Sequence, residues 1–391
     1  MKNKNGMLYL VVLNLFLVFL GVGLVVPVMP ALQKSMDLSG ATMGLMISVF
    51  AVFQLIVSPI AGNLSDKMGR KKIIAAGMLI FSISELIFGL GHTVGWLYLS
   101  RALGGIAAAF IMPSVTAYVA DITTFEERPK GMGLVSAAIS GGFIIGPGVG
   151  GFLAHFGIRA PFFAASFLAF LGFILAILVL KEPTKKFVTE EARETPIEDV
   201  TVWDILKDPV FTFPFIIILI SSFGLQAFEA IYGVMATTNF NFTMGEIAAI
   251  ITVSGVLALI CQLLFFDGII KKIGEAGLIR LAFFASAIFV GVMAFTSSKW
   301  VAAFSTFIIF LAFDLLRPAI TTYLSKHAGD RQGTVNGLNS TFTSFGNILG
   351  PMVSGMLFDI NHVYPYYVSS IVLLATGFLT LFWKKQVAKT R

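Results

Sequence analysis

The sequence of 391 residues is poor in charge and in side chains that bind metals. Charged residues make up 12% of it, whereas a soluble domain carries about 25%, so a water-soluble fold is disfavoured. The single cysteine, Cys261, excludes an intrachain disulfide and a cysteine-based metal cluster. The four histidines lie in predicted loops or at helix ends without metal-ligand spacing, so we expect no metal site.

Motifs of nucleotide chemistry and catalysis are missing as well. The sequence has no P-loop, which excludes direct coupling to ATP by this chain, and we expect no cofactor. An intramembrane hydrolase needs paired aspartates, a serine with a histidine, or histidine ligands at membrane depth, and none of these is present. We therefore expect that the protein is not an enzyme. No soluble module with a basic face is found either, so nucleic-acid binding is not expected.

Long apolar runs dominate what is present. Apolar residues make up 57% of the chain, and its mean hydropathy is +0.89. They form separated runs of about 18 to 25 residues, each long enough to cross a hydrocarbon core of roughly 30 Å as a helix. The sequence therefore predicts an all-α membrane protein with twelve transmembrane helices, at 7–29, 42–62, 73–91, 97–119, 131–155, 161–180, 210–234, 246–266, 276–296, 300–323, 335–357 and 363–383.

The positions of lysine and arginine predict the orientation in the membrane, because short loops that carry these residues are retained on the cytoplasmic side. With both termini inside, all but three basic residues fall on the inner side or within predicted helices, the exceptions being Lys34, Arg159 and Lys299. We therefore expect both termini in the cytoplasm, and we interpret the net charge of +6 as a consequence of this topology. The first span ends in Val25-Val26-Pro27 rather than at a small-residue cleavage site, which indicates a retained helix.

The chain contains two copies of one six-helix unit. At an offset of about 204 residues, the sequence aligns with itself at several positions. The matching pairs include Gly142 with Gly346, Gly146 with Gly350, Pro147 with Pro351, and Gly151 with Gly355. We expect two pseudo-symmetric halves, 1–180 and 209–391, joined by a hydrophilic cytoplasmic linker at 181–208. A parallel repeat of this kind suits alternating access, with a site between the halves near the bilayer midplane.

Four charged residues within predicted helices are the first candidates for function: Glu229, Asp314, Arg317 and Arg101. A charge at membrane depth costs roughly 2.5 to 3.5 kcal/mol on insertion scales, so by default it faces a water-filled cavity. Glu229 shares a helical face with Ser222, Gln226 and Gly233. A carboxylate in a partly desolvated cavity has a raised pKa, so it can exchange a proton and can also attract a cationic compound. The alternative for Glu229 is a purely structural ion pair.

Asp314 and Arg317 lie three residues apart and share a face with Phe310. The two charges can pair, and protonation of Asp314 would then free Arg317, which offers a switch as well as a proton site. The alternative is a static salt bridge that only offsets burial. Arg101 lies at a depth similar to that of Glu85 in the neighbouring helix, so a second pair is expected, with Arg101 either a relay or part of a structural pair.

Several motifs resemble those of a known family. The loop Gly62–Lys72 resembles the conserved loop between helices two and three of the major facilitator superfamily. Gly142–Gly151 resembles the glycine-proline motif of that superfamily's drug:proton antiporters. Ser222–Glu229 and Phe313–Thr321 resemble helices seven and ten of its NorA- and Bmr-like multidrug exporters. The resemblance spans essentially the whole chain and departs at Ser140, where that branch has a larger amide.

The resemblance implies a major facilitator fold and a proton-coupled antiporter of the bacterial cytoplasmic membrane. Its exported compounds are expected to be diverse, hydrophobic and often cationic, such as quinolones, ethidium and quaternary ammonium compounds. The alternative is an exporter or symporter of one endogenous metabolite such as a sugar. Glu229, Asp314, Arg317 and Arg101 are assigned to proton coupling. We expect a monomer in the lipid bilayer, with protons and small molecules as its partners.

Shared helical faces and the resemblance together predict an aromatic substrate cavity that contains carboxylates. Its residues are Phe19, Phe50, Gln54, Ser140, Phe143, Gln226, Glu229, Phe310 and Asp314. At the cytoplasmic side we expect a gate in which Asp66 caps the helix at 335–357 and pairs with Arg70, while Asp121 takes the remaining basic charge. The alternative, that this loop serves topology alone, leaves Gly69 unexplained. A close contact of the fifth span with the eighth is expected through Gly142, Gly146, Pro147, Gly150 and Gly151.

Overall fold

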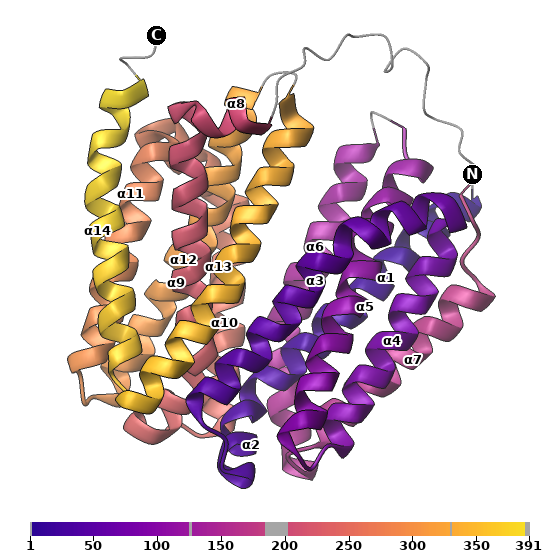
Figure 1. The fold of residues 1–391 in the computed structure, drawn as a ribbon, viewed down its shortest axis with the longest axis horizontal. Coiled ribbons are helices and arrows are strands. Elements are labelled where there is room, and N and C mark those ends of the chain that lie inside the picture. The colour runs from indigo at the N-terminus through magenta and orange to yellow at the C-terminus, as the bar shows by residue number, and fades with distance from the viewer. Residues whose placement is uncertain (1, 125–126, 184–201, 329–330, 388–391) are drawn as a thin grey trace. The chain divides into compact units, whose positions relative to one another are not determined.

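The computed structural model describes residues 2–124, 127–183, 202–328 and 331–387, and every regular element in these ranges is a helix (Figure 1). The chain divides into two compact units. Unit 1 comprises Met1–Leu38, Val49–Glu194 and Met244–Thr252, and unit 2 comprises Ser39–Ser48, Thr195–Thr243 and Val253–Arg391. The predicted halves, 1–180 and 209–391, and the linker at 181–208 stay predictions, and positions 184–201 lie outside the described residues.

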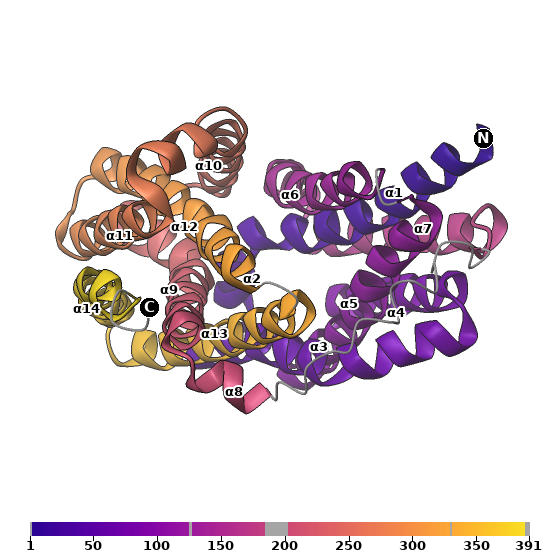
Figure 2. The same ribbon diagram turned by 90° about the horizontal axis from the view of Figure 1, so that it is seen from above.

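Unit 1 is built from the helices of the first part of the chain. Its elements are α1 (Lys2–Val25), η1 (Val26–Val28), α2 (Met29–Met36), most of α3 (Gly40–Met68), α4 (Arg70–Leu90), α5 (Val94–Ile122), α6 (Arg128–Leu153), η2 (Ala154–Phe156) and α7 (Ala160–Leu178). Helix α1 packs against α6 and α7, and α4 packs against α5 and α7 (Figure 2). The buried core between them is apolar and includes Val11, Met78, Phe81, Ile111 and Val115.

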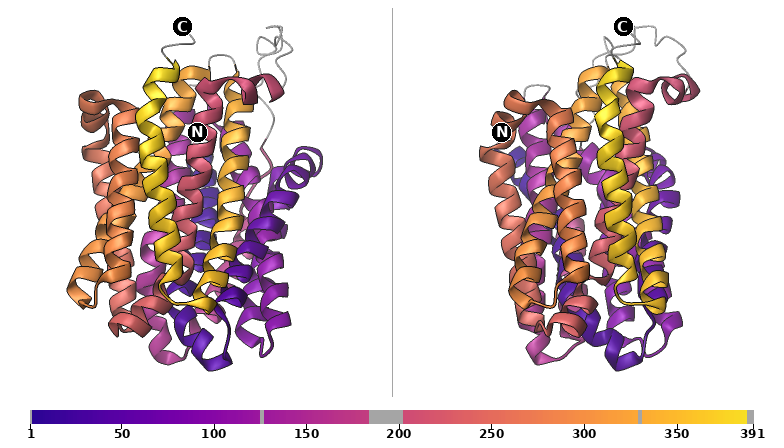
Figure 3. Two further views of the ribbon diagram at one scale, coloured as in Figure 1. Left: turned by 60° about the vertical axis from the view of Figure 1, so that its left-hand side comes forward. Right: turned by 90° about the vertical axis from the view of Figure 1, so that its left-hand side faces the viewer.

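Unit 2 repeats this arrangement with the later helices. Its elements are α8 (Val202–Lys207), α9 (Pro209–Phe240), most of α10 (Met244–Leu264), α11 (Phe266–Phe295), α12 (Lys299–Ala328), α13 (Gln332–Ile360) and α14 (Tyr364–Val387). Helix α9 packs against α13 and α14, and α11 packs against α12 and α14 (Figure 3). Two helices are shared, because the first turns of α3 belong to unit 2 and those of α10 belong to unit 1.

Each of the twelve predicted spans falls on a helix, which confirms the all-α class. Eleven helices in the described ranges are long and apolar enough to cross a membrane by length and composition. The predicted span at 335–357 lies in α13, a helix of 29 residues whose many glycine, serine, threonine and asparagine residues keep it out of that set. Its length is still sufficient to cross a hydrocarbon core of roughly 30 Å.

Proline shapes the first span. The prediction placed its end at residue 29, whereas the structure continues through a short 3₁₀ turn at Val26–Val28 into α2, which ends at Met36. Pro27 and Pro30 lack the N–H that an α-helix needs, so the hydrogen-bond pattern is interrupted and the chain resumes as a new helix. Other helix ends differ from the predicted runs in both directions: α9 continues to Phe240, six residues past the predicted end, whereas α7 and α10 each end two residues before it.

Candidate functional site

Glu229 lies on α9, whose start is fixed by Asp208. The Asp208 side chain accepts a hydrogen bond from the Val210 N–H at 2.9 Å, and Pro209 occupies the first helical position. The Glu229 side chain is exposed, and its Oε2 accepts a hydrogen bond of 2.9 Å from the Gln226 amide. Within the described residues its Oε1 has no partner. One oxygen of this carboxylate is thus oriented by the protein and the other is available to a ligand or a proton.

The accessible face of α9 differs in one position from the predicted one. Gln226, Glu229 and Gly233 are exposed or half-buried, as the spacing predicted, but Ser222 is buried at 8% exposure. A side-chain carbon at Gly346 of α13 would lie 2.6 Å from the Ser222 Cβ, so Ser222 packs against α13, while the later residues of this helical face are accessible. Phe223 takes its place at the accessible edge, since it is half-buried.

Asp314 and Arg317 lie on α12, with Asp314 half-buried and Arg317 exposed. Their charges attract each other, but among the described ion pairs none joins them, so the expected pairing is not present in this structure. The backbone carbonyl of Asp314 accepts a hydrogen bond of 3.2 Å from the Gln262 amide of α10. Its carboxylate has no hydrogen-bond partner in the part of the chain that the structure describes.

Glu229 and Asp314 are near enough within unit 2 to repel each other electrostatically. Two carboxylates that share a region of low polarity disfavour double ionisation, and protonation of either one relieves the repulsion.

Phe310 is buried behind this region. Its ring is 8% exposed and makes edge contacts with Phe228 at 5.6 Å and with Tyr232 at 6.0 Å between ring centroids. The prediction put Phe310 on the same face as Asp314, but the accessible residues of α12 next to Asp314 are Leu311 and Arg317. Phe310 therefore supports the site through packing in this structure.

The other predicted substrate residues belong to unit 1. Phe19 and Phe143 form a tilted aromatic pair with ring centroids 5.1 Å apart, and Phe143 is 43% exposed. Ser140, one turn before Phe143 on α6, is also exposed. Phe50 and Gln54 on α3 are half-buried. Each unit thus carries an accessible group of predicted substrate residues: Phe19, Phe50, Gln54, Ser140 and Phe143 in unit 1, and Gln226, Glu229 and Asp314 in unit 2.

The pairing of Arg101 with Glu85 is confirmed. Arg101 Nη2 lies 2.9 Å from Glu85 Oε1, and Glu85 is 1% exposed. The guanidinium also lies 4.4 Å from the centre of the Phe88 ring. Glu85 Oε2 and Arg101 Nε are buried without a hydrogen-bond partner. This pair is buried and lacks some of its possible hydrogen bonds, whereas the carboxylates of unit 2 are accessible.

The predicted cytoplasmic charge cluster is present around Arg70. Its guanidinium contacts Asp66 at 2.6 Å and Asp121 at 3.0 Å, as predicted. Gly69 has a φ of 101°, a conformation that favours glycine, which explains this residue in the loop. The expected cap of the helix at 335–357 by Asp66 stays a prediction.

Sequence reasoning missed one member of this cluster, Glu182. Its carboxylate accepts hydrogen bonds from the backbone N–H of Arg70 at 2.5 Å and of Lys71 at 3.0 Å, so it caps the start of α4. The neighbouring Lys181 carbonyl accepts a bond of 2.6 Å from the Tyr118 hydroxyl, which fixes this end of the chain segment. The available signal was an acidic residue just after an apolar span, which suits a nearby helix N-terminus.

The glycines of α6 make two kinds of contact. A Cβ at Gly142 or Gly146 would meet the backbone of Leu20 or Gly23 within 3 Å, and one at Gly150 would overlap Leu24, so these three face α1. Among the predicted contact residues, Gly151 carries the expected contact with the eighth span, where a Cβ would lie 2.7 Å from Ala248 of α10, and nearby Gly148 also faces α10, where a Cβ would lie 3.3 Å from the Thr252 hydroxyl. The first contact, with α1, was not expected. Pro147 is buried at this interface beside Gly23.

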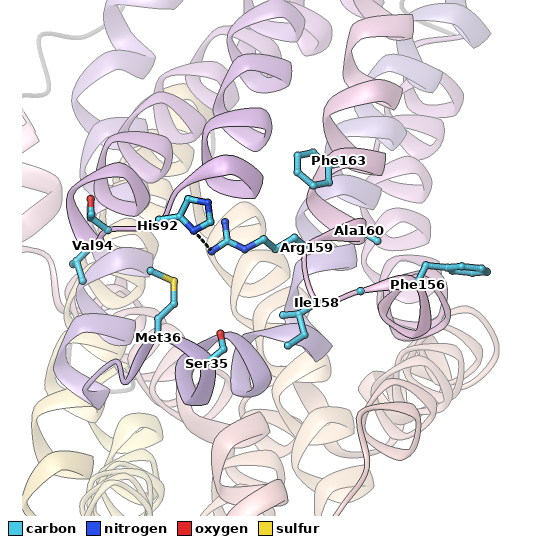
Figure 4. Close-up of a pocket in the computed structure, with 11 residues that line it drawn as sticks. Ser35, Met36, His92, Val94, Phe156, Ile158, Arg159, Ala160 and Phe163 are labelled. Carbon is cyan, nitrogen blue, oxygen red and sulfur yellow. Dashed lines mark hydrogen bonds between the residues drawn. The ribbon is translucent and has the colours of Figure 1, made fainter.

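A pocket of about 910 Å³ lies elsewhere in unit 1, between the ends of its helices (Figure 4). His92, Arg159 and Phe163 are among its lining residues. Arg159 donates hydrogen bonds to the Gly89 and Gly91 carbonyls at 2.8 and 2.7 Å, so it closes the C-terminus of α4. None of the predicted site residues lines this pocket, and Arg159 has a structural role in it.

Comparison with known proteins gives full-length matches. The family model described as Major Facilitator Superfamily matches residues 11–351 and again 215–391. Multidrug resistance protein 2 of Bacillus subtilis (strain 168) is 48% identical over 387 residues, covering 98% of this chain and 97% of that protein. Multidrug resistance protein 1 of the same organism is 47% identical over 384 residues, 98% of each. Quinolone resistance protein NorA of Staphylococcus aureus (strain Mu50 / ATCC 700699) is 39% identical over 387 residues, 99% of each.

Solved structures share the fold. A bacterial homolog of the human lysosomal transporter Spinster, in an inward-facing and unoccupied conformation, matches with a TM-score of 0.81 and 17% identity over 100% of this chain and 98% of that one. The nucleoside transporter NupG matches with a TM-score of 0.79 and 13% identity over 97% of this chain and 99% of that one. At these identities the likeness shows the fold alone.

Proposed function

The chain belongs to the Major Facilitator Superfamily, and from this premise we propose that it exports diverse hydrophobic, often cationic, compounds in exchange for protons. It is a multi-pass protein of the bacterial cytoplasmic membrane. Relatives named for multidrug and quinolone resistance, matched along nearly its whole length, support the substrate class. The observation that carries the proposal is an accessible carboxylate, Glu229, that has no ion-pair partner in the described residues of a membrane-spanning helix.

The proposed exchange takes place on Glu229 and Asp314. Their mutual repulsion favours one bound proton, and an incoming lipophilic cation replaces that proton by offering its own positive charge. The Gln226 amide holds Oε2 of Glu229, which leaves Oε1 for the proton or the cation. The accessible aromatic rings, such as Phe143, bind the apolar part of the compound without a fixed hydrogen-bond pattern. Broad specificity follows from this kind of contact.

Arg317 and Arg101 have different parts in the proposed cycle. Arg317 is exposed and attracts Asp314, so it competes with the proton and the drug for that carboxylate. Arg101 is held by Glu85, and the unsatisfied atoms of that pair leave room for a rearrangement during the cycle. Asp66, Arg70, Asp121 and Glu182 stabilise the cytoplasmic end of unit 1 as a gate. We propose a monomer, since each chain carries both groups of substrate residues.

The membrane potential supplies enough energy for accumulation. A proton that enters down about 100 mV releases roughly 2.3 kcal/mol, which supports a concentration ratio of about fiftyfold for each charge moved. No nucleotide is needed in this scheme.

Ethidium efflux tests the proposal. Cells or vesicles that contain the protein are loaded with ethidium, and the loss of fluorescence is followed with and without a protonophore. We expect energised efflux at several times the rate of an empty-vector control, and collapse to the control rate when the protonophore is added. Efflux that continues unchanged after the proton gradient is removed would contradict proton coupling.

A further inference from the structure

The first turn of α3 is tied to the end of α13. Asp359 Oδ1 accepts a hydrogen bond from the Gly40 N–H at 2.6 Å, and Oδ2 accepts one from the Ala41 N–H at 2.8 Å. The Ser39 hydroxyl accepts from Thr42 N–H at 3.1 Å, so the remaining free donor of the turn is capped locally. One carboxylate from a distant part of the chain therefore completes the start of α3.

Close packing continues the contact along both helices. A Cβ at Gly40 would lie 2.8 Å from the Gly355 carbonyl oxygen, and one at Gly44 would overlap Pro351. Four residues further, the Ser48 hydroxyl donates a hydrogen bond of 2.6 Å to the Ile348 carbonyl. All these residues belong to unit 2. The contact thus extends over the outer turns of both helices.

Asp359 is unfavourably placed for its own helix. It lies in the last turn of α13, where the negative end of the helix dipole disfavours a carboxylate. At the start of α3 the same charge meets the positive end of a dipole and two N–H donors, which is favourable. The favourable contact with α3 offsets the unfavourable interaction of Asp359 with the dipole of α13. When the two helices separate, Asp359 loses this stabilisation and the start of α3 loses two hydrogen-bond acceptors.

The repeat offers an internal comparison. The position that corresponds to Asp359 in the first copy is His155 of η2, whose ring Nδ1 bonds to the carbonyls of Gly151 and Phe152 in the preceding helix α6, both at 3.1 Å. A carboxylate is therefore a feature of the α13 copy alone. The glycine contacts are made in both copies, also where this carboxylate is missing, which indicates that Asp359 has a separate role.

We propose that Asp359 is a latch that holds the outer end of α3 on α13 and sets how often the protein opens to the outside. The inference rests on the proposed function, because a latch has meaning only in an alternating-access cycle. With the termini in the cytoplasm, both the start of α3 and the end of α13 face the outer side of the membrane. Asp359 is in this sense a positioning residue, remote from Glu229 and Asp314 in sequence and in role.

The distance between two spin labels tests the latch. Lys34 and Tyr364 are replaced by cysteine in a C261S background, and label-to-label distances are measured in lipid nanodiscs by pulsed electron resonance. D359N keeps the shape of the side chain but removes its charge. We expect it to raise the ratio of the longer to the shorter distance population by about two- to thirtyfold, the range of a carboxylate at a helix N-terminus.

Two further variants complete the test. A41P removes the second donor while Asp359 keeps its charge, and proline is tolerated in the first turn of a helix, so the same direction of change is expected. D37N is the matched control, because Asp37 is an exposed carboxylate of the same loop, in a left-handed conformation that asparagine adopts readily. D37N is expected to leave the populations unchanged.

The outcomes separate the latch from the proposed function. An unchanged distribution in D359N and A41P, beside a wild type with two populations, would overturn the latch alone. An equal shift in D37N would overturn it too, since surface charge would then explain the effect. A wild type with a single distance, with or without ethidium and a proton gradient, would overturn both the latch and the alternating-access proposal.

Discussion

The charged side chains within the spans divide into two kinds. Arg101 and Glu85 form a buried pair, and Arg70 is held by two carboxylates, so their charges are largely neutralised inside the protein. Glu229 is exposed, and no ion pair in the described ranges includes it. Removing a member of a buried pair leaves an uncompensated charge and destabilises the fold, whereas an accessible, unpaired carboxylate can change without that cost. We therefore expect that a change at Glu229 affects function without a matching loss of stability.

Substitution of Glu229 tests this separation. E229Q keeps the hydrogen-bonding shape but cannot bind or release a proton, so we expect protonophore-sensitive ethidium efflux to fall at least tenfold, to near the level of an empty vector. Because Glu229 has no buried charge partner, the amount of folded protein in the membrane should stay close to wild type. E229D is the control that keeps the carboxylate and should retain measurable efflux. Wild-type efflux in E229Q would remove this residue from the mechanism.

At the scale of helices, the glycines of α6 and α13 decide how closely the elements pack. Gly146 and Gly150 bring α6 against α1, and Gly346 and Gly350 bring α13 against α9. Near its end, each of these helices also contacts another helix: Gly151 of α6 packs against α10, and Gly355 of α13 packs against α3. The glycine pairs that the repeat matches, Gly142 with Gly346, Gly146 with Gly350 and Gly151 with Gly355, thus make corresponding contacts in the two copies.

A pair of alanine variants in α6 tests the packing. A Cβ at Gly150 would overlap the Leu24 backbone, so G150A is expected to destabilise the protein by about 1–3 kcal/mol, as overpacking does, and to lower the melting temperature in detergent. Gly133 lies in the same helix with nothing within 4 Å of an added Cβ. G133A should be neutral or stabilise by up to about 1 kcal/mol, since alanine is the better helix former. An equal loss in both variants would contradict a specific contact.

The sequence predicted helices well and contacts across the fold unevenly. Hydropathy located every span, and charge together with predicted depth was enough for the Arg70–Asp66 and Arg101–Glu85 pairs. It did not locate Glu182 or Asp359, because each caps a helix more than a hundred residues away in the chain. Helical spacing placed Phe310 beside Asp314, but the aromatic neighbours that bury Phe310 come from α9, and a single-helix pattern contains no information about them.

At the scale of the molecule, the glycine contacts are duplicated in both copies of the repeat, whereas the charged residues of the proposed exchange site are not. The glycine contacts occur in both copies, whereas Glu229 and Asp314 occur only in unit 2, and Asp359 has a histidine as its counterpart. A parallel repeat relates the two halves to each other and does not exchange the two sides of the membrane, so the repeat alone does not set a direction of transport. In the proposed cycle these carboxylates bind protons and drug in turn, and the proton gradient sets the direction of export.

Proton release on drug binding tests the central claim of exchange most directly. Purified protein in a weakly buffered detergent solution is mixed with ethidium, binding is followed by fluorescence, and released protons are followed with a pH indicator. The account predicts proton release in proportion to ethidium bound by the wild type, and its loss in E229Q and D314N. Saturable ethidium binding to the wild type without any release of protons, at every pH tested, would contradict the account.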